Sequence, residues 1–243
     1  MSGKGTKKAV ETMDGAEASG ERPPRKPRQR RHFERKREDI LDAATLLINE
    51  KGAKGTTLQS VAEAVNLNTT SVTYYFRRKE LLAAAVFERA MERMHAIAGE
   101  AAAMPTPRER VHRFLQLHVQ LCAAVLREEA LPLVPLSDMR TLEDAIRIPL
   151  ERNYQELFRV VRSFFGPAGD HKELMGARAH ILLETVFWLP VWISVYPIDD
   201  FRRIKDRLFE IVEKGIAPID AVWAPLRLPA DADGEDPEEQ GTN

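Results

Sequence analysis

The chain has 243 residues, of which 44% are hydrophobic and 30% charged, and its formal net charge at pH 7 is −1. A chain of this length can bury a core without staples, and Cys122, its single cysteine, excludes an intrachain disulfide framework. The longest apolar run, residues 181–196, is interrupted by Glu184 and Pro190 and falls short of the roughly 18 to 20 residues of a transmembrane helix. Residues 1–32 lack the apolar core of a signal peptide. We therefore expect a cytoplasmic protein with no membrane partner.

The small net charge conceals an uneven distribution. Residues 22–37 hold nine Arg and Lys and one acid, which gives +8, whereas residues 229–243 hold six acids and no base, which gives −6. Residues 1–32 and 229–243 have almost no large apolar side chains, so we expect a disordered basic arm and a disordered acidic tail. Such asymmetry is typical of tails that contact nucleic acid or membrane; the alternative is that both tails only keep the chain soluble.

The first helices follow from the spacing of apolar residues. Residues 40–48 carry apolar side chains on one helical face, and Gly52 and Gly55 end that helix. Thr56 or Thr57 caps a short second helix, and Asn68 caps a third short helix after the turn 66–68. A long helix then begins near Lys79 and ends at about Met104, before Pro105 and Pro107.

The remaining residues predict four more helices, over roughly 108–129, 141–165, 171–195 and 199–214, with a looser segment at 131–138. Pro149 either kinks the second of these or marks its true start. Because no stretch alternates like a strand, the fold class is all-α, with about nine helices. We expect the first 47 of the ordered residues, 33–79, to form one domain and residues 80–228 a second.

Residues 57–76 show the pattern of a helix-turn-helix, with an apolar helix in front. If Val72 faces inward, Phe76 packs beside it, while Thr70, Thr73 and Tyr74 face outward with Ser71 at their edge. Hydroxyl groups can bond base edges or phosphates, and the flanking residues 77–79 add three positive charges. The alternative is a plain helical hairpin with a Ser- and Thr-rich surface.

The stretch TTLQSVAEAVNLNTTSVTYYFRRKELL resembles the DNA-binding signature of the tetracycline-repressor (TetR) family of bacterial regulators. That signature reads roughly T-T-x-x-x-I-A-x-x-A-G-V-S-x-G-T-L-Y-Y-H-F-x-x-K-E-x-L, and the resemblance covers residues 34–94. Five of the chain's departures from that signature matter for the turn and the recognition helix. The turn glycine is Asn66, the cap serine Asn68, the recognition-helix glycine Thr70, the first tyrosine Thr73 and the histidine Tyr75.

The resemblance implies an N-terminal three-helix DNA-binding domain, a C-terminal helical ligand-binding and dimerisation domain, and a double-stranded DNA operator as partner. The residues then expected to face DNA are Thr57, Gln59, Asn68, Thr69, Thr70, Ser71, Thr73, Tyr74, Tyr75 and Lys79. The basic arm would emerge beside the duplex and reach a minor groove or the phosphates. Its candidate residues are Arg25, Lys26, Arg28, Arg30 and Arg31.

The C-terminal domain offers candidate ligand and dimer residues, each with core packing as its alternative. The candidate pocket residues are Phe114, His118, Cys122, Tyr154, Phe158, His180, Glu184 and Trp188. Residues 187–193 are apolar all round the helix, so we expect a second subunit to cover one side. The candidate interface residues are Phe187, Trp192, Phe201 and Leu208; a monomer core is the alternative.

The function that follows is a homodimeric repressor that leaves a pseudo-palindromic operator when an unidentified small effector binds. We expect no catalytic residue, metal or cofactor, because no nucleophile, phosphate-loop or metal-ligand motif is found. An enzyme and a helical interaction protein that has lost DNA binding are the competing interpretations.

Overall fold

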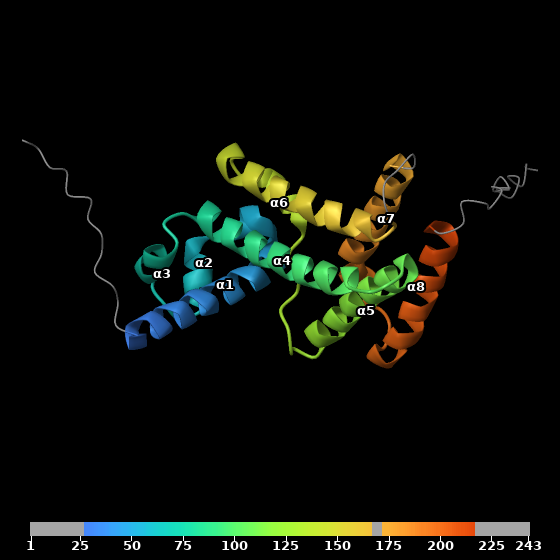
Figure 1. Ribbon diagram of the computed structural model, residues 1–243. Helices are drawn as coiled ribbons and strands as arrows, with labels where there is room; N and C mark the ends of the chain where they lie inside the picture. The colour runs from blue at the N-terminus through green and yellow to red at the C-terminus, as the bar shows by residue number, and fades with distance from the viewer. Residues whose placement is uncertain (1–26, 167–171, 217–243) are drawn as a thin grey trace, which may run out of the picture.

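The computed structural model describes residues 27–166 and 172–216, which form eight α-helices and two 3₁₀ helices with no strand among them (Figure 1). The expected all-α fold is confirmed. The chain is elongated, with α3 near one end and α8 at the other, and α4 runs through the middle (Figure 1). The last residues of the expected second domain, 217–228, and the acidic tail lie outside the described residues.

Four helices make up the first half: α1 (Pro27–Gly55), α2 (Leu58–Ala64), α3 (Thr69–Tyr75) and α4 (Lys79–Ala102). Helix α1 begins at Pro27, so the boundary expected at residue 33 was wrong. Proline is favoured at the first helical position, and the Arg, Gln, Glu and Lys residues that follow are good helix formers. Part of the basic arm is therefore an extension of α1.

Helix α1 contains an internal break at Gly52, whose φ is 72°. Glycine adopts this backbone conformation without steric cost. The break frees the amide of Ala53, which donates a hydrogen bond to the carboxylate of Asp138, 2.8 Å away. The end of α1 is thus tied to a residue 85 positions further along the chain.

The second half contains α5 (Pro107–Leu126), η1 (Leu136–Thr141), α6 (Asp144–Ser163), α7 (Lys172–Ile193), η3 (Ile198–Asp200) and α8 (Phe201–Ile216). Thr106 caps α5, since its hydroxyl accepts from the amide of Glu109 and its amide donates to the Glu109 carboxylate. Helix α6 starts at Asp144 and includes Pro149. The helices predicted from the sequence are thus found to within a few residues.

One hydrophobic core joins the two halves. Ile40 and Ile48 of α1 pack in the same cluster as Val72 of α3 and Phe87 of α4, all fully buried. The cluster also contains Met139 and other residues of η1 and α6. The domain boundary expected between residues 79 and 80 therefore falls at the start of α4, a helix that packs in both halves of the molecule.

Helix α7 has the length and composition of a membrane-spanning helix. This differs from the sequence expectation, which counted only the run 181–196. The core helix of a soluble protein passes the same test, and Leu182, Leu183 and Val186 are buried against α4, α5 and α6 residues. We therefore interpret α7 as a core helix with one uncovered face.

Candidate nucleic-acid interface

The helix-turn-helix begins with a capping box at α2. The hydroxyl of Thr57 accepts from the amide of Ser60, and the Thr57 amide donates to the Ser60 hydroxyl. Val61 and Ala62 of α2 are buried, and so is Val72 of α3, which fixes the two short helices against α1 and α4. The inward position assigned to Val72 from the sequence agrees with its complete burial.

The turn between α2 and α3 depends on two asparagines. Asn66 has a φ of 53°, the left-handed conformation that asparagine tolerates better than most residues. Asn68 caps α3, because its side-chain oxygen accepts from the Ser71 amide at 2.7 Å. Asn66 thus adopts the turn conformation for which the TetR signature has glycine, and Asn68 caps the helix where that signature has serine.

Helix α3 presents a face of hydroxyl groups to solvent. Thr69, Thr70 and Thr73 are exposed, and Tyr74 is 54% exposed. Ser71 and Tyr75 are partly buried at the edges of this face. The Thr73 hydroxyl donates to the Thr69 carbonyl at 2.8 Å, so its methyl group and lone pairs remain for an outside partner. A face of this kind suits base edges, thymine methyls and phosphates.

The start of α1 packs on the end of α3 through three aromatic rings. Phe33 stacks on Tyr75 with ring centroids 4.7 Å apart, and it meets the edge of Tyr74 at 6.0 Å. The two tyrosines meet edge to face at 5.4 Å. This contact holds the basic start of α1 beside the recognition helix.

A shallow groove of about 440 Å³ runs between α1 and α3. Its walls include His32 and Lys36 of α1 as well as Asn68, Thr70 and Tyr74. His32 and Lys36 did not figure among the sequence-derived site residues. Their spacing of four residues places both on one face of α1, but that signal needs the helix to start before residue 32.

Three polar residues near the turn are engaged within the protein. The Gln59 amide donates to Glu63 at 3.0 Å, and the Lys79 ammonium donates to the Lys54 carbonyl at 3.2 Å. Arg78 pairs with Glu143 at the start of α6 at 3.2 Å. All are exposed, so DNA can compete for Gln59 and Lys79. Of the basic arm, Arg28, Arg30 and Arg31 belong to α1, whereas Arg25 and Lys26 lie outside the described residues.

The candidate pocket residues divide into two groups. His118 and Cys122 line a small cavity of about 60 Å³ between α5, the segment 132–133 and α7, while Phe114 is fully buried beside His118. Phe158 and His180 pack ring to ring elsewhere, with centroids 4.3 Å apart. The structure does not bring the other five residues into this cavity: Tyr154, Phe158, His180, Glu184 and Trp188.

Burial sets the charge state of the cavity. The His118 Nδ1–H donates to the Phe114 carbonyl at 2.8 Å, and burial lowers the pKa of His118 to about 4. Burial also raises the pKa of the Cys122 thiol to about 11. Both groups are therefore uncharged at neutral pH.

The candidate interface residues lie nearer the subunit's own core than expected. Phe201 is buried in a cluster with Val119 and Leu189, and Trp192 and Leu208 pack on the same cluster. Phe187 packs on the core around Leu182. Trp188, assigned to the pocket from the sequence, is instead 60% exposed. Adjacent residues of a helix point about 100° apart, so Phe187 can face the core while its neighbour Trp188 faces solvent.

A buried two-helix motif with an exposed polar recognition helix defines the class of protein: a helix-turn-helix DNA-binding regulator. Comparison with protein families narrows this class further. Residues 40–86 match the model described as bacterial regulatory proteins of the tetR family. This segment contains the helix-turn-helix, so the DNA-binding part of the chain is similar to that of the tetR family of regulators.

Two curated relatives are similar over different lengths. An HTH-type transcriptional regulator in the dhlA 5′ region of Xanthobacter autotrophicus is 24% identical over 187 residues, covering 73% of this chain and 88% of that protein. The HTH-type transcriptional regulator BetI of Burkholderia thailandensis is 32% identical over 97 residues, covering 38% of this chain and half of BetI.

Solved structures share the fold at low sequence identity. AibR in complex with isovaleryl coenzyme A and operator DNA has a TM-score of 0.60 at 19% identity, covering 72% of this chain and 96% of AibR. A TetR-family regulator from Bordetella parapertussis has a TM-score of 0.62 at 17% identity, covering 74% of this chain and 94% of that chain.

Proposed function

We propose that the protein is a homodimeric repressor that binds a pseudo-palindromic operator and leaves it when a small effector binds. The observation that carries the DNA-binding part is the exposed hydroxyl face of α3 above a completely buried Val72. The match of residues 40–86 to the model of the tetR family supports the same function. Because this face has no arginine or lysine, base recognition rests on hydroxyl groups, methyl groups and DNA shape.

The dimer proposal rests on the uncovered face of α7. Ile181 and Trp188, seven residues apart on this helix, are more than half exposed, and so is Val195, which lies just beyond the end of the helix. Val191 of the same helix and Ile211 of α8 are also more than 60% exposed. Such an apolar surface is unusual on a monomer and is the kind that a second copy covers. The interface thus uses Trp188 in place of the more buried Phe201.

The effector proposal rests on the cavity beside His118 and Cys122. Its walls are apolar, and its two titratable groups are neutral at pH 7, so it suits an uncharged, apolar ligand. A volume of about 60 Å³ is far below the roughly 300 Å³ of common ligand sites, so binding must widen it. That widening is how an effector would favour one arrangement of the subunits over another.

We also propose that the protein acts in the cytoplasm at the nucleoid and has no catalytic activity. Its relatives are named as transcriptional regulators, which supports both statements.

The test is selection of duplex DNA by the full-length protein, followed by footprinting of the enriched sequence. We expect a pseudo-palindrome whose half-sites lie about one helical turn apart. Replacing both Thr70 and Tyr74 with alanine should abolish binding, whereas Ser137→Ala, at an exposed position of η1, should not change it. If no sequence is enriched, the alternative of a helical interaction protein without DNA binding stands.

A further inference from the structure

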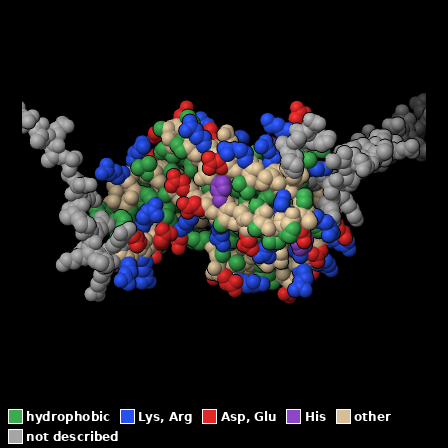
Figure 2. Space-filling view, viewed as in Figure 1, with side chains coloured by type: hydrophobic (Ala, Val, Ile, Leu, Met, Phe, Trp, Pro, Cys, Tyr) green, Lys and Arg blue, Asp and Glu red, His purple; other side chains and the backbone are tan. Residues whose placement is uncertain are grey.

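A second crevice lies where α1, α4 and the segment 131–134 meet, close to the DNA-binding end. Its volume is about 230 Å³. Its apolar wall includes Val86 and Val134, and its polar groups are the Thr45 hydroxyl and the guanidinium groups of Arg89 and Arg93. The crevice is distinct from the cavity beside His118, although Pro132 and Leu133 line both. Figure 2 shows basic and acidic side chains mixed over the visible face of the molecule.

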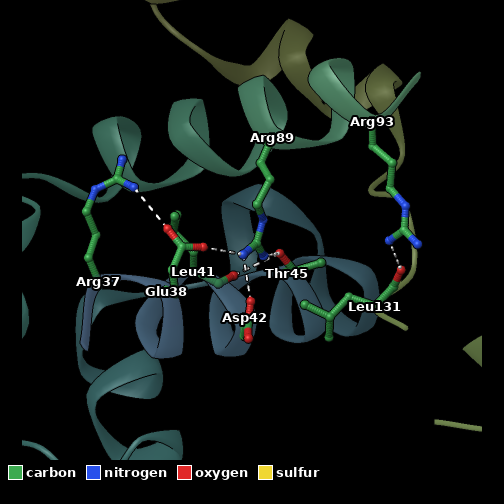
Figure 3. Close-up of polar contacts among 8 residues, drawn as sticks. All are labelled: Arg37, Glu38, Leu41, Asp42, Thr45, Arg89, Arg93 and Leu131. Carbon is green, nitrogen blue, oxygen red and sulfur yellow. Dashed lines mark hydrogen bonds and ion pairs between the residues drawn. The ribbon is translucent and has the colours of Figure 1, made fainter. Parts of the chain in front are cut away.

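The two arginines come from successive turns of α4 and extend toward α1 (Figure 3). Both terminal nitrogens of Arg89 are engaged. Its Nη1 lies 2.6 Å from Asp42 and 3.4 Å from Glu38, and its Nη2 donates to the Thr45 hydroxyl at 2.6 Å. Asp42 therefore compensates the charge of Arg89, while Glu38 is shared between Arg89 and Arg37, whose Nη1 lies 3.5 Å from it.

Arg93 is engaged differently. Its Nη1 donates to the Leu131 carbonyl at 3.1 Å, and no carboxylate among the described residues pairs with it. Burial and the neighbouring Arg89 lower the pKa of Arg93, yet a guanidinium stays charged at any physiological pH. The crevice thus contains one partly buried positive charge without a counter-charge, and with donors to spare.

We propose that this crevice binds a small organic monoanion, a carboxylate with a short aliphatic chain. A guanidinium fork matches the two oxygens of a carboxylate, and a charge of −1 balances Arg93 without overcompensating it. The short chain lies on the apolar wall. A phosphate dianion would add excess negative charge beside Asp42 and Glu38, so the charge balance favours the carboxylate. The proposal does not depend on DNA binding or on the cavity beside His118.

The experiment is calorimetric titration of full-length, DNA-free protein with sodium butyrate, at constant ionic strength set by sodium chloride. We expect saturable binding of one butyrate per chain. Sodium phosphate should give no more heat than chloride. Arg93→Met should weaken butyrate binding by more than about tenfold, because the variant loses the hydrogen bonds between the guanidinium and the carboxylate. Arg113→Met is the matched control, because Arg113 lies on α5 and pairs with Glu100.

Two further variants test the role of charge. Asp42→Asn removes a competitor for Arg89 and should tighten butyrate binding. Arg93→Lys keeps the positive charge but loses the two parallel N–H donors of the guanidinium, so it should bind butyrate more weakly than the wild type. This variant replaces Arg93→Met in the test if Arg93→Met fails to fold. The proposal is wrong if the wild type shows no saturable binding of butyrate. It is also wrong if Arg93→Met and Arg113→Met bind butyrate equally well, or if phosphate binds as butyrate does.

Discussion

At the residue scale, His118 links the stability of the protein to pH. Its pKa is about 4 in the folded protein and about 6.5 in an unfolded chain. Between these values the unfolded chain binds a proton that the folded protein does not. Stability should therefore fall as the pH drops from about 6.5 to about 4, by about 3 kcal/mol in total.

Urea unfolding at several pH values in this window measures the effect. His118→Leu, which cannot titrate, should flatten the dependence on pH even if its stability is lower throughout. His112→Gln is the control, since His112 is only partly buried, and most of the slope should remain. An unchanged slope in His118→Leu would contradict the assignment.

At the element scale, the turn between α2 and α3 depends on the left-handed backbone of Asn66. Asn66→Val should destabilise the protein by about 1 to 2 kcal/mol, because a β-branched residue clashes in this conformation. Asn66→Gly should stay within about 1 kcal/mol of the wild type. Thermal unfolding of the two variants checks the prediction, and equal melting temperatures would refute it.

The elements were predictable from the sequence because their signals are local. Periodic apolar residues, Pro107, Asn68 and the glycines of residues 52–55 fix most helix ends to within a few residues. The start of α1 was missed because charged residues before residue 33 form a helix without any apolar periodicity. The contacts of Phe33 with α3, and the groove with His32 and Lys36, could not be predicted without that start.

The pocket and the interface were harder to predict because they depend on how each helix is rotated about its own axis. Helix α7 is apolar nearly all round, so its sequence does not distinguish the exposed Trp188 from the partly buried Phe187. Only packing against α5 and α6 decides this. From the sequence alone, Arg89 and Arg93 are interpreted as part of a solvent-exposed helix face. Their contacts with α1 and with Leu131 are seen only in the structure.

At the scale of the whole molecule, the uncovered face of α7 should hold two chains together. Trp188→Glu places a charge in the middle of this apolar face, so the variant should be monomeric while its helical circular dichroism is unchanged. Sedimentation equilibrium measures the mass. Arg159→Glu, at an exposed position of α6, is a control that should stay dimeric. A wild type that is monomeric at micromolar concentration, or a Trp188→Glu dimer, would contradict the proposal.

The hydrogen bond from Ala53 to Asp138 makes the Ala53 amide a spectroscopic probe of the contact between the two halves of the chain. Its acceptor belongs to η1, and the break at Gly52 frees this amide from the helix, so its exchange with deuterium requires the contact between α1 and η1 to open locally. The exchange rate of one backbone proton thus follows how firmly the DNA-binding end is held against the rest of the chain. Ligands at either cavity can be compared by how much they slow or speed that single proton.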